Sequence, residues 1–259
     1  MKNNHILEYK EYGYTVVKGV LPKSSIQALT DTLDAVFTQS LEVLSIAHEE
    51  LDLHNKMYQL LINDKDAYIK VLSSLWRLLA LQEFLYQPAM LNMIKSMFAF
   101  DNIYLPGATV INTMSNRLKI PNGYFGFEPH QDYATTQGSK ESVVCWVPLV
   151  DIDINMFPLQ VLPKSHQSGL FPLEDKGHVF ATKPEYYDKN AFISLTCKAG
   201  DVVLMDIFTL HRTSMLGDER LRMACSARFD NGINTDFVTA HYPTGLLRSF
   251  KRDHYKQPK

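Results

Sequence analysis

The chain has 259 residues, a formal net charge of −2 and a hydrophobic fraction of 46%. This composition is typical of a globular protein with a large core, and a chain of this length does not require a second domain. Nucleic-acid-binding proteins normally carry a basic excess, so we expect no nucleic-acid partner.

The cysteines point to a reducing compartment. Cys145, Cys197 and Cys225 have neither an even count nor the C-x-x-C spacing of a disulfide framework or zinc site. Residues 1–5 contain no apolar signal core, and no stretch reaches the roughly 18 apolar residues of a membrane span. We therefore expect a cytoplasmic protein with no membrane partner, whose oligomeric state stays open.

The first hundred residues are predicted to be mostly helical. Residues 12–17 are aromatic and β-branched, which indicates one strand. After Pro22, apolar residues recur every three or four positions, and Ser24 or Ser25 can cap the first helix. Helices are predicted over residues 26–44, 51–62, 64–79 and 88–98.

The pattern changes after residue 100, where short apolar stretches alternate with turn residues. Strands are predicted over residues 102–105, 109–114, 142–149, 159–163, 192–195, 202–205 and 222–229. Residues 170–190 show no clear period and are predicted to form a long loop. Short strands with regular turns are typical of a sandwich or barrel. We expect a β core over about 101–230, helical support over about 22–100, and one domain spanning 1–259.

His130 and Asp132 are the strongest candidates for metal ligands. On a strand, residues i and i+2 point to the same face, so both side chains can reach one metal ion. Two ligands do not hold a catalytic metal, and His211 is the best candidate for the third. Two histidines and a carboxylate form the facial triad of non-haem Fe(II) oxygenases. The absence of thiolate ligands argues against a structural zinc centre.

Other carboxylates compete with Asp132 for this role. They are Asp151, Asp153, Asp201 and Asp206. Asp201 follows a glycine and is predicted to be a turn residue. Asp206 is predicted either to support a ligand or to lie in a surface loop.

Arg222 follows His211 in the chain and is the candidate partner for an anionic co-substrate. A planar guanidinium that binds a carboxylate through two hydrogen bonds suits a 2-oxo acid. Arg220 and Arg228 are alternatives, and Arg222 and Arg228 have the same parity on a strand, so both can face inward.

In this order and spacing, the motifs resemble the phytanoyl-CoA dioxygenase family of Fe(II)- and 2-oxoglutarate-dependent oxygenases. The resemblance covers most of the chain. It rests on Tyr12-Gly13-Tyr14, Val20-Leu21-Pro22, His130-Gln131-Asp132, Trp146-Val147-Pro148-Leu149, the stretch 159–166, Gly200-Asp201, His211 and Arg222.

This resemblance implies a mainly β fold with flanking helices: a double-stranded β-helix, which is a cupin-like jelly-roll barrel, with an N-terminal helical layer packed outside. It implies that His130, Asp132 and His211 bind Fe(II), and that Arg222 binds the distal carboxylate of 2-oxoglutarate. Met114, Trp146 and Thr213 fall where the family lines the co-substrate pocket. Lys164 replaces the usual glycine before Ser-His, and residues 155–158 replace the family's Asn-Gly turn; both departures lie in loops.

The leading hypothesis is therefore a dioxygenase that oxidises, most simply by hydroxylation, a small organic molecule. It would consume O2 and 2-oxoglutarate and release succinate and CO2, with ascorbate as a candidate reductant. The presence of Asp132 disfavours a halogenase. One alternative is a jelly-roll protein that retains a metal without oxidising anything. Another is a cupin-type isomerase, which would need no co-substrate arginine. The weak match over the helical part leaves the substrate open.

Overall fold

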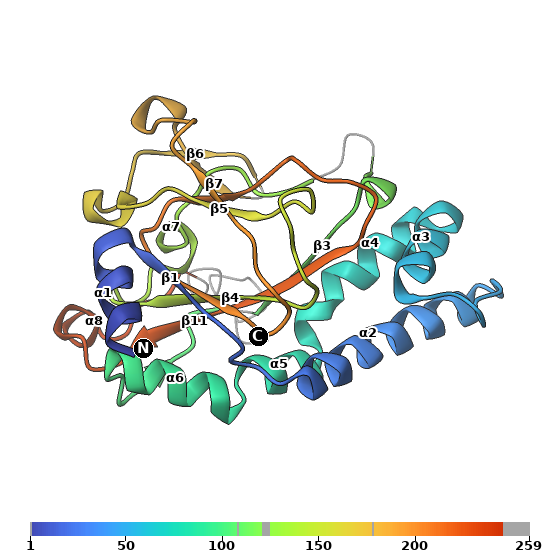
Figure 1. The fold of residues 1–259 in the computed structure, drawn as a ribbon, viewed down its shortest axis with the longest axis horizontal. Helices are drawn as coiled ribbons and strands as arrows, with labels where there is room; N and C mark the ends of the chain where they lie inside the picture. The colour runs from blue at the N-terminus through green and yellow to red at the C-terminus, as the bar shows by residue number, and fades with distance from the viewer. Residues whose placement is uncertain (1, 108, 121–124, 178, 246–259) are drawn as a thin grey trace, which may run out of the picture.

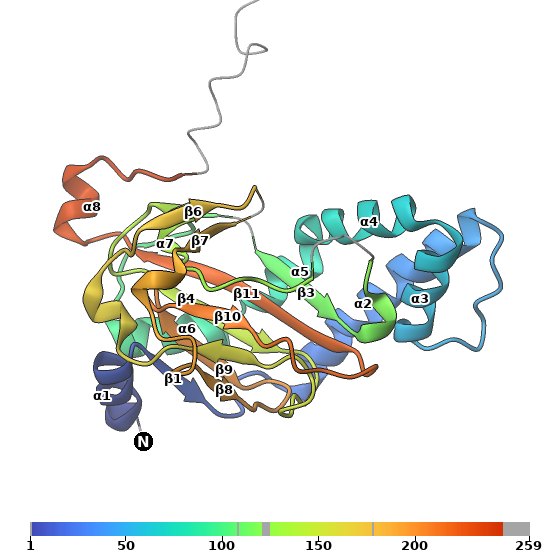
Figure 2. The ribbon, with the colours of Figure 1, turned by 90° about the horizontal axis from the view of Figure 1, so that it is seen from above.

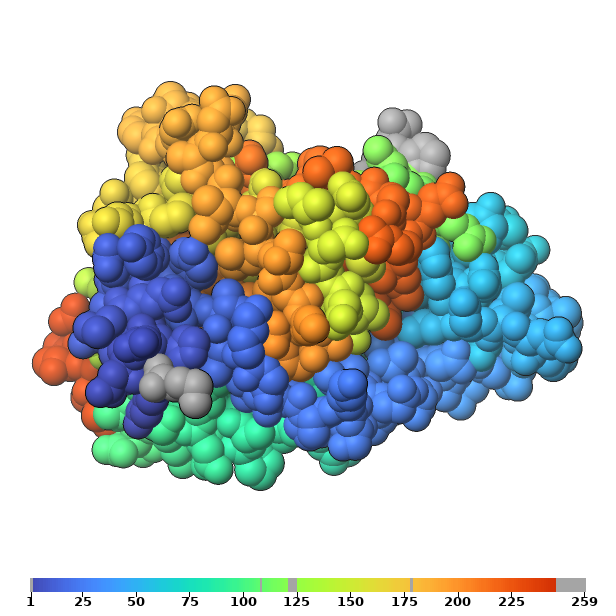
Figure 3. Space-filling model, in the orientation of Figure 1, coloured from blue at the N-terminus to red at the C-terminus, as the bar shows by residue number. Residues whose placement is uncertain are grey.

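The computed structural model describes residues 2–107, 109–120, 125–177 and 179–245. Antiparallel sheets occupy one side of the molecule, and the helices between the first strand and residue 98 lie along the other (Figure 1). The end of the helix Lys23–Val43 and the helix Leu53–Asn63 extend beyond the sheets at one end (Figures 1 and 3).

The predicted helices are confirmed, with changes at their ends. Helix α2 (Lys23–Val43) buries Ile26, Leu29, Leu33, Phe37 and Leu41, which gives the three- and four-residue spacing read from the sequence. It is followed by α3 (Leu53–Asn63), α4 (Lys65–Ser74), α5 (Leu79–Leu85) and α6 (Pro88–Phe98).

Two local predictions in this part need correction, and one helix was missed. Pro22, which lacks a capping side chain, precedes α2, and Ser25 Oγ instead donates to Gln87 Oε1 across 3.2 Å. The single helix predicted over residues 64–79 is interrupted by a 3-10 turn at Leu75–Arg77, which separates α4 from α5. Helix α1 (Lys2–Tyr12) was not predicted, because it is mostly polar and buries only Tyr9.

The largest sheet has six strands. Its order is β1 (Tyr14–Val17), β9 (Val202–Asp206), β4 (Val143–Pro148), β11 (Arg222–Asn231) and β2 (Ile103–Tyr104), with β3 (Val110–Met114) also paired to β11. Every neighbouring pair is antiparallel. Strand β11 is the longest and crosses the whole sheet (Figure 2).

Two smaller antiparallel sheets complete the β part. One contains β10 (His211–Thr213), β5 (Leu159–Val161) and β8 (Ile193–Leu195). The other is a hairpin of β6 (Leu173–Asp175) and β7 (Phe180–Thr182), which the prediction of one long loop over residues 170–190 did not include. Across the described residues the three sheets do not join into a closed barrel. The long helices make the fold mixed α and β, not mainly β as predicted.

The two faces of the large sheet have different neighbours. Cys145, Val147 and Cys225 belong to one apolar cluster with the buried faces of the helices. Val144, Trp146 and Ala224 belong to a second cluster with residues of the small β10–β5–β8 sheet. Because strand residues alternate between faces, the second set points into the space between the two sheets. No helix in the described parts of the chain is long and apolar enough to cross a membrane.

Asp230, near the end of β11, is a buried carboxylate that links this strand to the loop before β4. Its Oδ1 accepts a hydrogen bond from Ser142 Oγ. Gly138 lies against the same carboxylate, because a Cβ at this position would overlap Asp230 Oδ2. Burial raises the pKa of Asp230 to about 6, although the hydrogen bond from Ser142 opposes the shift.

We expect Asp230→Asn to remove a pH-dependent component of stability. The folded state holds a proton on Asp230 up to about pH 6, whereas an aspartate in an unfolded chain titrates near pH 3.9. The proton therefore stabilises the folded state at low pH, and this contribution, about 3 kcal/mol, is lost as pH rises from about 4 to 6. Urea unfolding at several pH values measures it.

The matched control is Asp236→Asn, because Asp236 is an exposed carboxylate paired with Lys140. The free energy of unfolding of the wild type should fall relative to Asp230→Asn across this pH range, and Asp236→Asn should follow the wild type. A constant difference between wild type and Asp230→Asn would contradict the assignment.

Candidate metal centre

A two-way backbone bridge brings His130 and His211 together. The amide of His130 donates to the carbonyl of His211 across 3.0 Å, and the reverse bond is 3.1 Å long. Residue 130 thereby pairs with the first residue of β10, although the two lie far apart in the chain. The imidazole ring centroids are 4.2 Å apart, and both side chains are buried.

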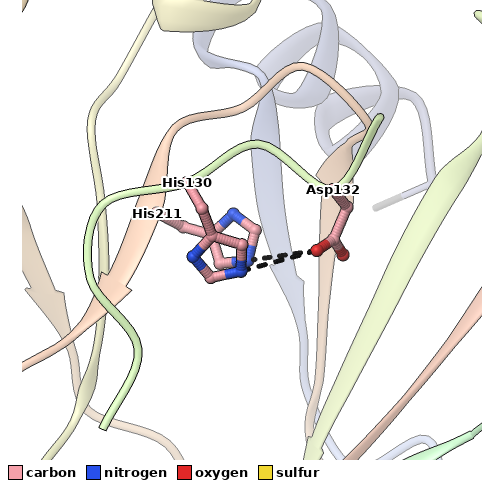
Figure 4. Close-up of side chains that lie close together, drawn as sticks. All are labelled: His130, Asp132 and His211. Atoms are coloured by element: carbon pink, nitrogen blue, oxygen red, sulfur yellow. Dashed lines mark ion pairs between the residues drawn. The ribbon is translucent and has the colours of Figure 1, made fainter. Parts of the chain in front are cut away.

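The hydrogen bonds of the two rings determine which nitrogen is available to a metal. His130 Nδ1 lies 2.7 Å from the carbonyl oxygen of Glu128, and His211 Nδ1 lies 2.9 Å from that of Thr209. A carbonyl oxygen can only accept, so each Nδ1 carries the proton. Nε2 is therefore the nitrogen that each ring offers to a metal, and Figure 4 shows both Nε2 atoms facing Asp132.

Asp132 completes the group, but not through strand geometry. Its backbone has helical angles, φ −63° and ψ −27°, just before the short helix α7 (Tyr133–Thr136). Asp132 therefore lies beside His130 as predicted, but the strand alternation from which this was predicted does not apply, because Asp132 is not on a strand. Asp132 Oδ1 lies 3.5 Å from His130 Nε2 and 3.9 Å from His211 Nε2. One ligand atom from each of the three residues lies within 4.8 Å of the others.

Gln131, between the two ligands in the chain, ties residues 130–132 to the backbone of distant loops. Its amide nitrogen donates to the carbonyls of Phe208, across 2.6 Å, and Gly169, across 2.8 Å. Its side-chain oxygen accepts from the amide of Phe171 at 2.8 Å. This role of Gln131 was not predicted from the sequence, because its partners are backbone groups of distant loops.

The electrostatics favour a cation at this position. Burial would raise the pKa of Asp132, but the positive charge of the Arg228 guanidinium holds it well below its ordinary value. Burial and the neighbouring His130 lower the pKa of His211 to about 4. At neutral pH, therefore, an ionised carboxylate faces the unprotonated Nε2 of His211. Such a donor set fits a divalent metal such as Fe(II).

Arg228, on β11, holds the other oxygen of the carboxylate. Its Nε donates to Asp132 Oδ2 across 2.8 Å, and its Nη2 lies 2.7 Å from the same oxygen. Its Nη1 donates to Ser226 Oγ across 3.0 Å. This arrangement leaves Oδ1 directed at the histidines. From the sequence, Arg228 was predicted only as an alternative to Arg222, and this contact was not predicted.

The predicted co-substrate residues lie beside the triad. Arg222 is buried, pairs across the sheet with Met114 and lies 5.2 Å from the centroid of the Trp146 ring. Arg222, Trp146 and Thr213 line one cavity of about 270 Å³ together with the triad. Met114 does not line it; this residue lies in an adjoining cavity of about 390 Å³, which Arg222 and Thr213 also border. Their binding of a co-substrate stays a prediction.

The competing carboxylates have other partners. Asp201 accepts hydrogen bonds from the amides of Gly19 and Lys198, as expected of a turn residue, and pairs with Lys18. Asp206 accepts from the amide of Phe208. Within the described ranges, His130, Asp132 and His211 form the one group of three or more such side chains placed to hold a metal.

Comparisons with solved structures give several relatives of the fold. One is the epimerase SnoN in complex with Fe3+, alpha-ketoglutarate and nogalamycin RO, which is 16% identical with a TM-score of 0.55 over 89% of this chain and 83% of SnoN. AviO1 from Streptomyces viridochromogenes Tue57 is 13% identical, with a TM-score of 0.57 over 90% of this chain and 96% of AviO1. The carbocyclase SnoK of nogalamycin biosynthesis is 15% identical, with a TM-score of 0.51 over 95% and 92%. No curated protein sequence matches.

At these identities the structures show the fold alone. The buried pair of imidazoles with one carboxylate places the protein in the class of non-haem metal enzymes. The family model for phytanoyl-CoA dioxygenase (PhyH) matches residues 9–220, which is most of the chain, so the chain belongs to this family. It is thus a non-haem iron, 2-oxoglutarate-dependent oxygenase by family, and the resemblance seen in the sequence is confirmed.

We expect Asp132→Ala to abolish stabilisation of the protein by Mn(II), a redox-silent substitute for Fe(II), because only two protein ligands remain. In the wild type, Mn(II) at a hundredfold excess over its Kd should add about 2.7 kcal/mol. That corresponds to several degrees in the unfolding midpoint, at about 2–4 °C per kcal/mol. The measurement is the shift caused by Mn(II), not the midpoint itself, because the substitution also leaves Arg228 without its carboxylate.

The control is Asp206→Asn, which alters a carboxylate outside the triad and should keep the shift caused by Mn(II). An undiminished shift in Asp132→Ala would exclude Asp132 as a ligand.

Proposed function

We propose that the protein is an Fe(II)- and 2-oxoglutarate-dependent dioxygenase that oxidises a small organic molecule, most simply by hydroxylation. One observation carries the proposal: the His130–Asp132–His211 group and the buried Arg222 line the same cavity. We further propose that the sheets are an open version of the family's double-stranded β-helix, and that residues 1–259 act as one domain.

The residues of the chain would divide the work as follows. His130, Asp132 and His211 hold Fe(II), and Arg222 binds the distal carboxylate of 2-oxoglutarate. Bound iron supplies the chemistry that couples O2 to oxidation of 2-oxoglutarate, with succinate and CO2 as products. The Arg222 guanidinium lies over the Trp146 ring, which would help to hold it in place. Thr213, on β10, lines the cavity.

Two features of the cavity suit this chemistry. Much of its lining is apolar, including Val144, Leu159 and Met205, which limits the entry of water into the reaction space. Met114 lies directly across the β3–β11 pair from Arg222, so it would support the arginine from the adjoining cavity and would not touch the metal.

An epimerase and a carbocyclase share the fold, so the fold is compatible with outcomes other than hydroxylation. Hydroxylation is the simplest outcome. The expectations of a cytoplasmic location and of no nucleic-acid partner stay predictions.

We expect Mn(II) and 2-oxoglutarate to bind cooperatively, because the two would touch each other in one site. Under anaerobic conditions, thermal unfolding is measured with Mn(II), with 2-oxoglutarate, and with both. Together they should raise the midpoint by more than the sum of the separate shifts, and succinate should replace 2-oxoglutarate poorly. Aerobic incubation with Fe(II) and ascorbate should then release succinate slowly without a primary substrate.

The same experiment distinguishes the enzyme from a binding protein. If the metal binds but 2-oxoglutarate neither adds stability nor is consumed, a metal-retaining protein without oxygenase activity becomes the better account.

We expect Arg222→Leu to weaken the binding of 2-oxoglutarate far more than the binding of Mn(II). Loss of one partner of a buried charge pair costs about 2–5 kcal/mol, which is about one and a half to three and a half decades in affinity. Calorimetric titration of 2-oxoglutarate into the Mn(II) protein measures the change. Arg212→Leu is the matched control, because Arg212 lines the same cavity but donates to Gln160 and to the carbonyl of Lys189. An equal loss in both variants would remove Arg222 from its proposed role.

A further inference from the structure

The guanidinium of Arg228 is only partly used by the protein. It has five N–H groups. Nε and one N–H of Nη2 serve Asp132 Oδ2, and one N–H of Nη1 serves Ser226 Oγ. Among the described residues, the second N–H of Nη1 and that of Nη2 have no protein acceptor. We call this pair the open edge of Arg228. It has the fork geometry that binds both oxygens of a carboxylate.

Arg228 also borders the same cavity as the triad and Arg222. The two arginines lie six residues apart on β11, so their Cα atoms are separated by roughly 20 Å along the strand. Arg228 is tied to the metal-ligating carboxylate, whereas Arg222 lies beside Trp146 at the other end. One small dianion whose distal carboxylate binds Arg222 therefore does not need Arg228 to hold that end.

The charges in this cavity do not balance without another anion. Asp132 is its single acidic side chain among the described lining residues, and three arginines, Arg212, Arg222 and Arg228, also line it. Arg222 is buried and the Arg228 side chain is 14% exposed, whereas Arg212 is partly exposed and its charge is screened by solvent. Apart from Arg212, a divalent metal adds two positive charges and 2-oxoglutarate adds two negative ones, which leaves one positive charge. An uncompensated buried charge is costly, so a further monoanion is expected in the completed site.

From these observations, and resting on the proposed function, we infer that the primary substrate is a small molecule with an apolar body and one carboxylate, which binds the open edge of Arg228 beside the metal. The apolar lining from Val110, Val144, Leu159 and Met205 accommodates the body. A volume of about 270 Å³, shared with the co-substrate, limits its size. The surplus positive charge disfavours an amine at the same position.

The same fork could instead bind the carboxylate of 2-oxoglutarate that lies nearest the metal. Charge balance favours the primary substrate, because this second arrangement would still leave one positive charge uncompensated. The experiment therefore has separate arms for the two sources of the carboxylate.

The test uses probes that share a body and differ in the head group: 3-phenylpropanoate, 3-phenylpropanamide and 3-phenylpropylamine, with 3-methylbutanoate and 3-methylbutanamide as a smaller pair. Each is titrated anaerobically into the full-length protein saturated with Mn(II) and 2-oxoglutarate, and binding is measured by calorimetry and thermal unfolding. At least one carboxylate should bind about ten- to a hundredfold more tightly than its amide, as expected for hydrogen bonds to a charged group. The amine should not bind.

Two substitutions then assign the contact. Arg228→Gln should remove the preference for carboxylate over amide while 2-oxoglutarate still binds. Arg228→Lys keeps the charge but lacks the fork, and it should retain only part of the preference. The lysine variant also serves if the glutamine variant does not fold. Arg212→Gln, which alters an arginine of the same cavity that is bound by Gln160, should leave the preference unchanged.

Several results would overturn the inference. They are equal binding of carboxylates and amides, no carboxylate binding in the wild type, displacement of 2-oxoglutarate by the carboxylates, and an unchanged preference in both Arg228 variants. If Arg228→Gln loses 2-oxoglutarate instead, the fork belongs to the co-substrate. If Mn(II) and 2-oxoglutarate do not couple in the wild type, the proposed function itself fails; if they couple normally and only the probes fail, the inference alone falls.

Discussion

The candidate metal centre depends on the pair of backbone hydrogen bonds between residues 130 and 211. Because peptide geometry fixes the spacing of such a pair, it places the two imidazole rings side by side, with their centroids 4.2 Å apart. The carbonyls of Glu128 and Thr209 then set each ring's tautomer. Both of these carbonyls lie two residues before the histidine that they contact. The same short backbone pattern is thus used twice, once on each side of the bridge, and it directs both Nε2 lone pairs to one point.

Asp132 is oriented by contacts that reach it from the large sheet and from the loops. Arg228 binds Oδ2 from β11, and the neighbouring Gln131 ties the turn to the backbone of residues 169, 171 and 208. A buried ion pair of this kind adds little net stability, because desolvation of both charges offsets their attraction. Its effect is orientation: one carboxylate oxygen is engaged, and the other is left for a cation. The metal site is therefore preorganised by protein groups alone, and a metal that binds it needs little rearrangement.

The sequence predicted what depends on local pattern and on residue chemistry. The three- and four-residue spacing in α2 reports a buried helical face, and the alternating residues of β11 report a strand between two layers. The triad was found because its residue types and order are specific, although Asp132 lies in a helical turn and not on a strand. Contacts between distant segments could not be predicted. Parity showed that Arg222 and Arg228 can face the same way, but only the folded chain shows that Arg228 meets Asp132. Helix α1 and the β6–β7 hairpin were missed for a related reason, since neither has a strong apolar period.

Strand β11 connects these observations, because its inward residues cross the whole cavity floor. Arg222, Ser226 and Arg228 line the cavity, and Ala224 packs in the apolar cluster between the two sheets. They alternate with Cys225 and Ala227, which pack toward the helices. A shift of one residue in its pairing would send both arginines into the helical core and place apolar side chains beside the metal ligands. The register of β11 with β4 and β3 is therefore a functional constraint as well as a structural one. The buried Asp230 and its contact with Ser142 lie at the end of this strand, where they help to hold that register. Packing of the helices against the outer face of the sheet thus contributes directly to the position of the charged groups on its inner face.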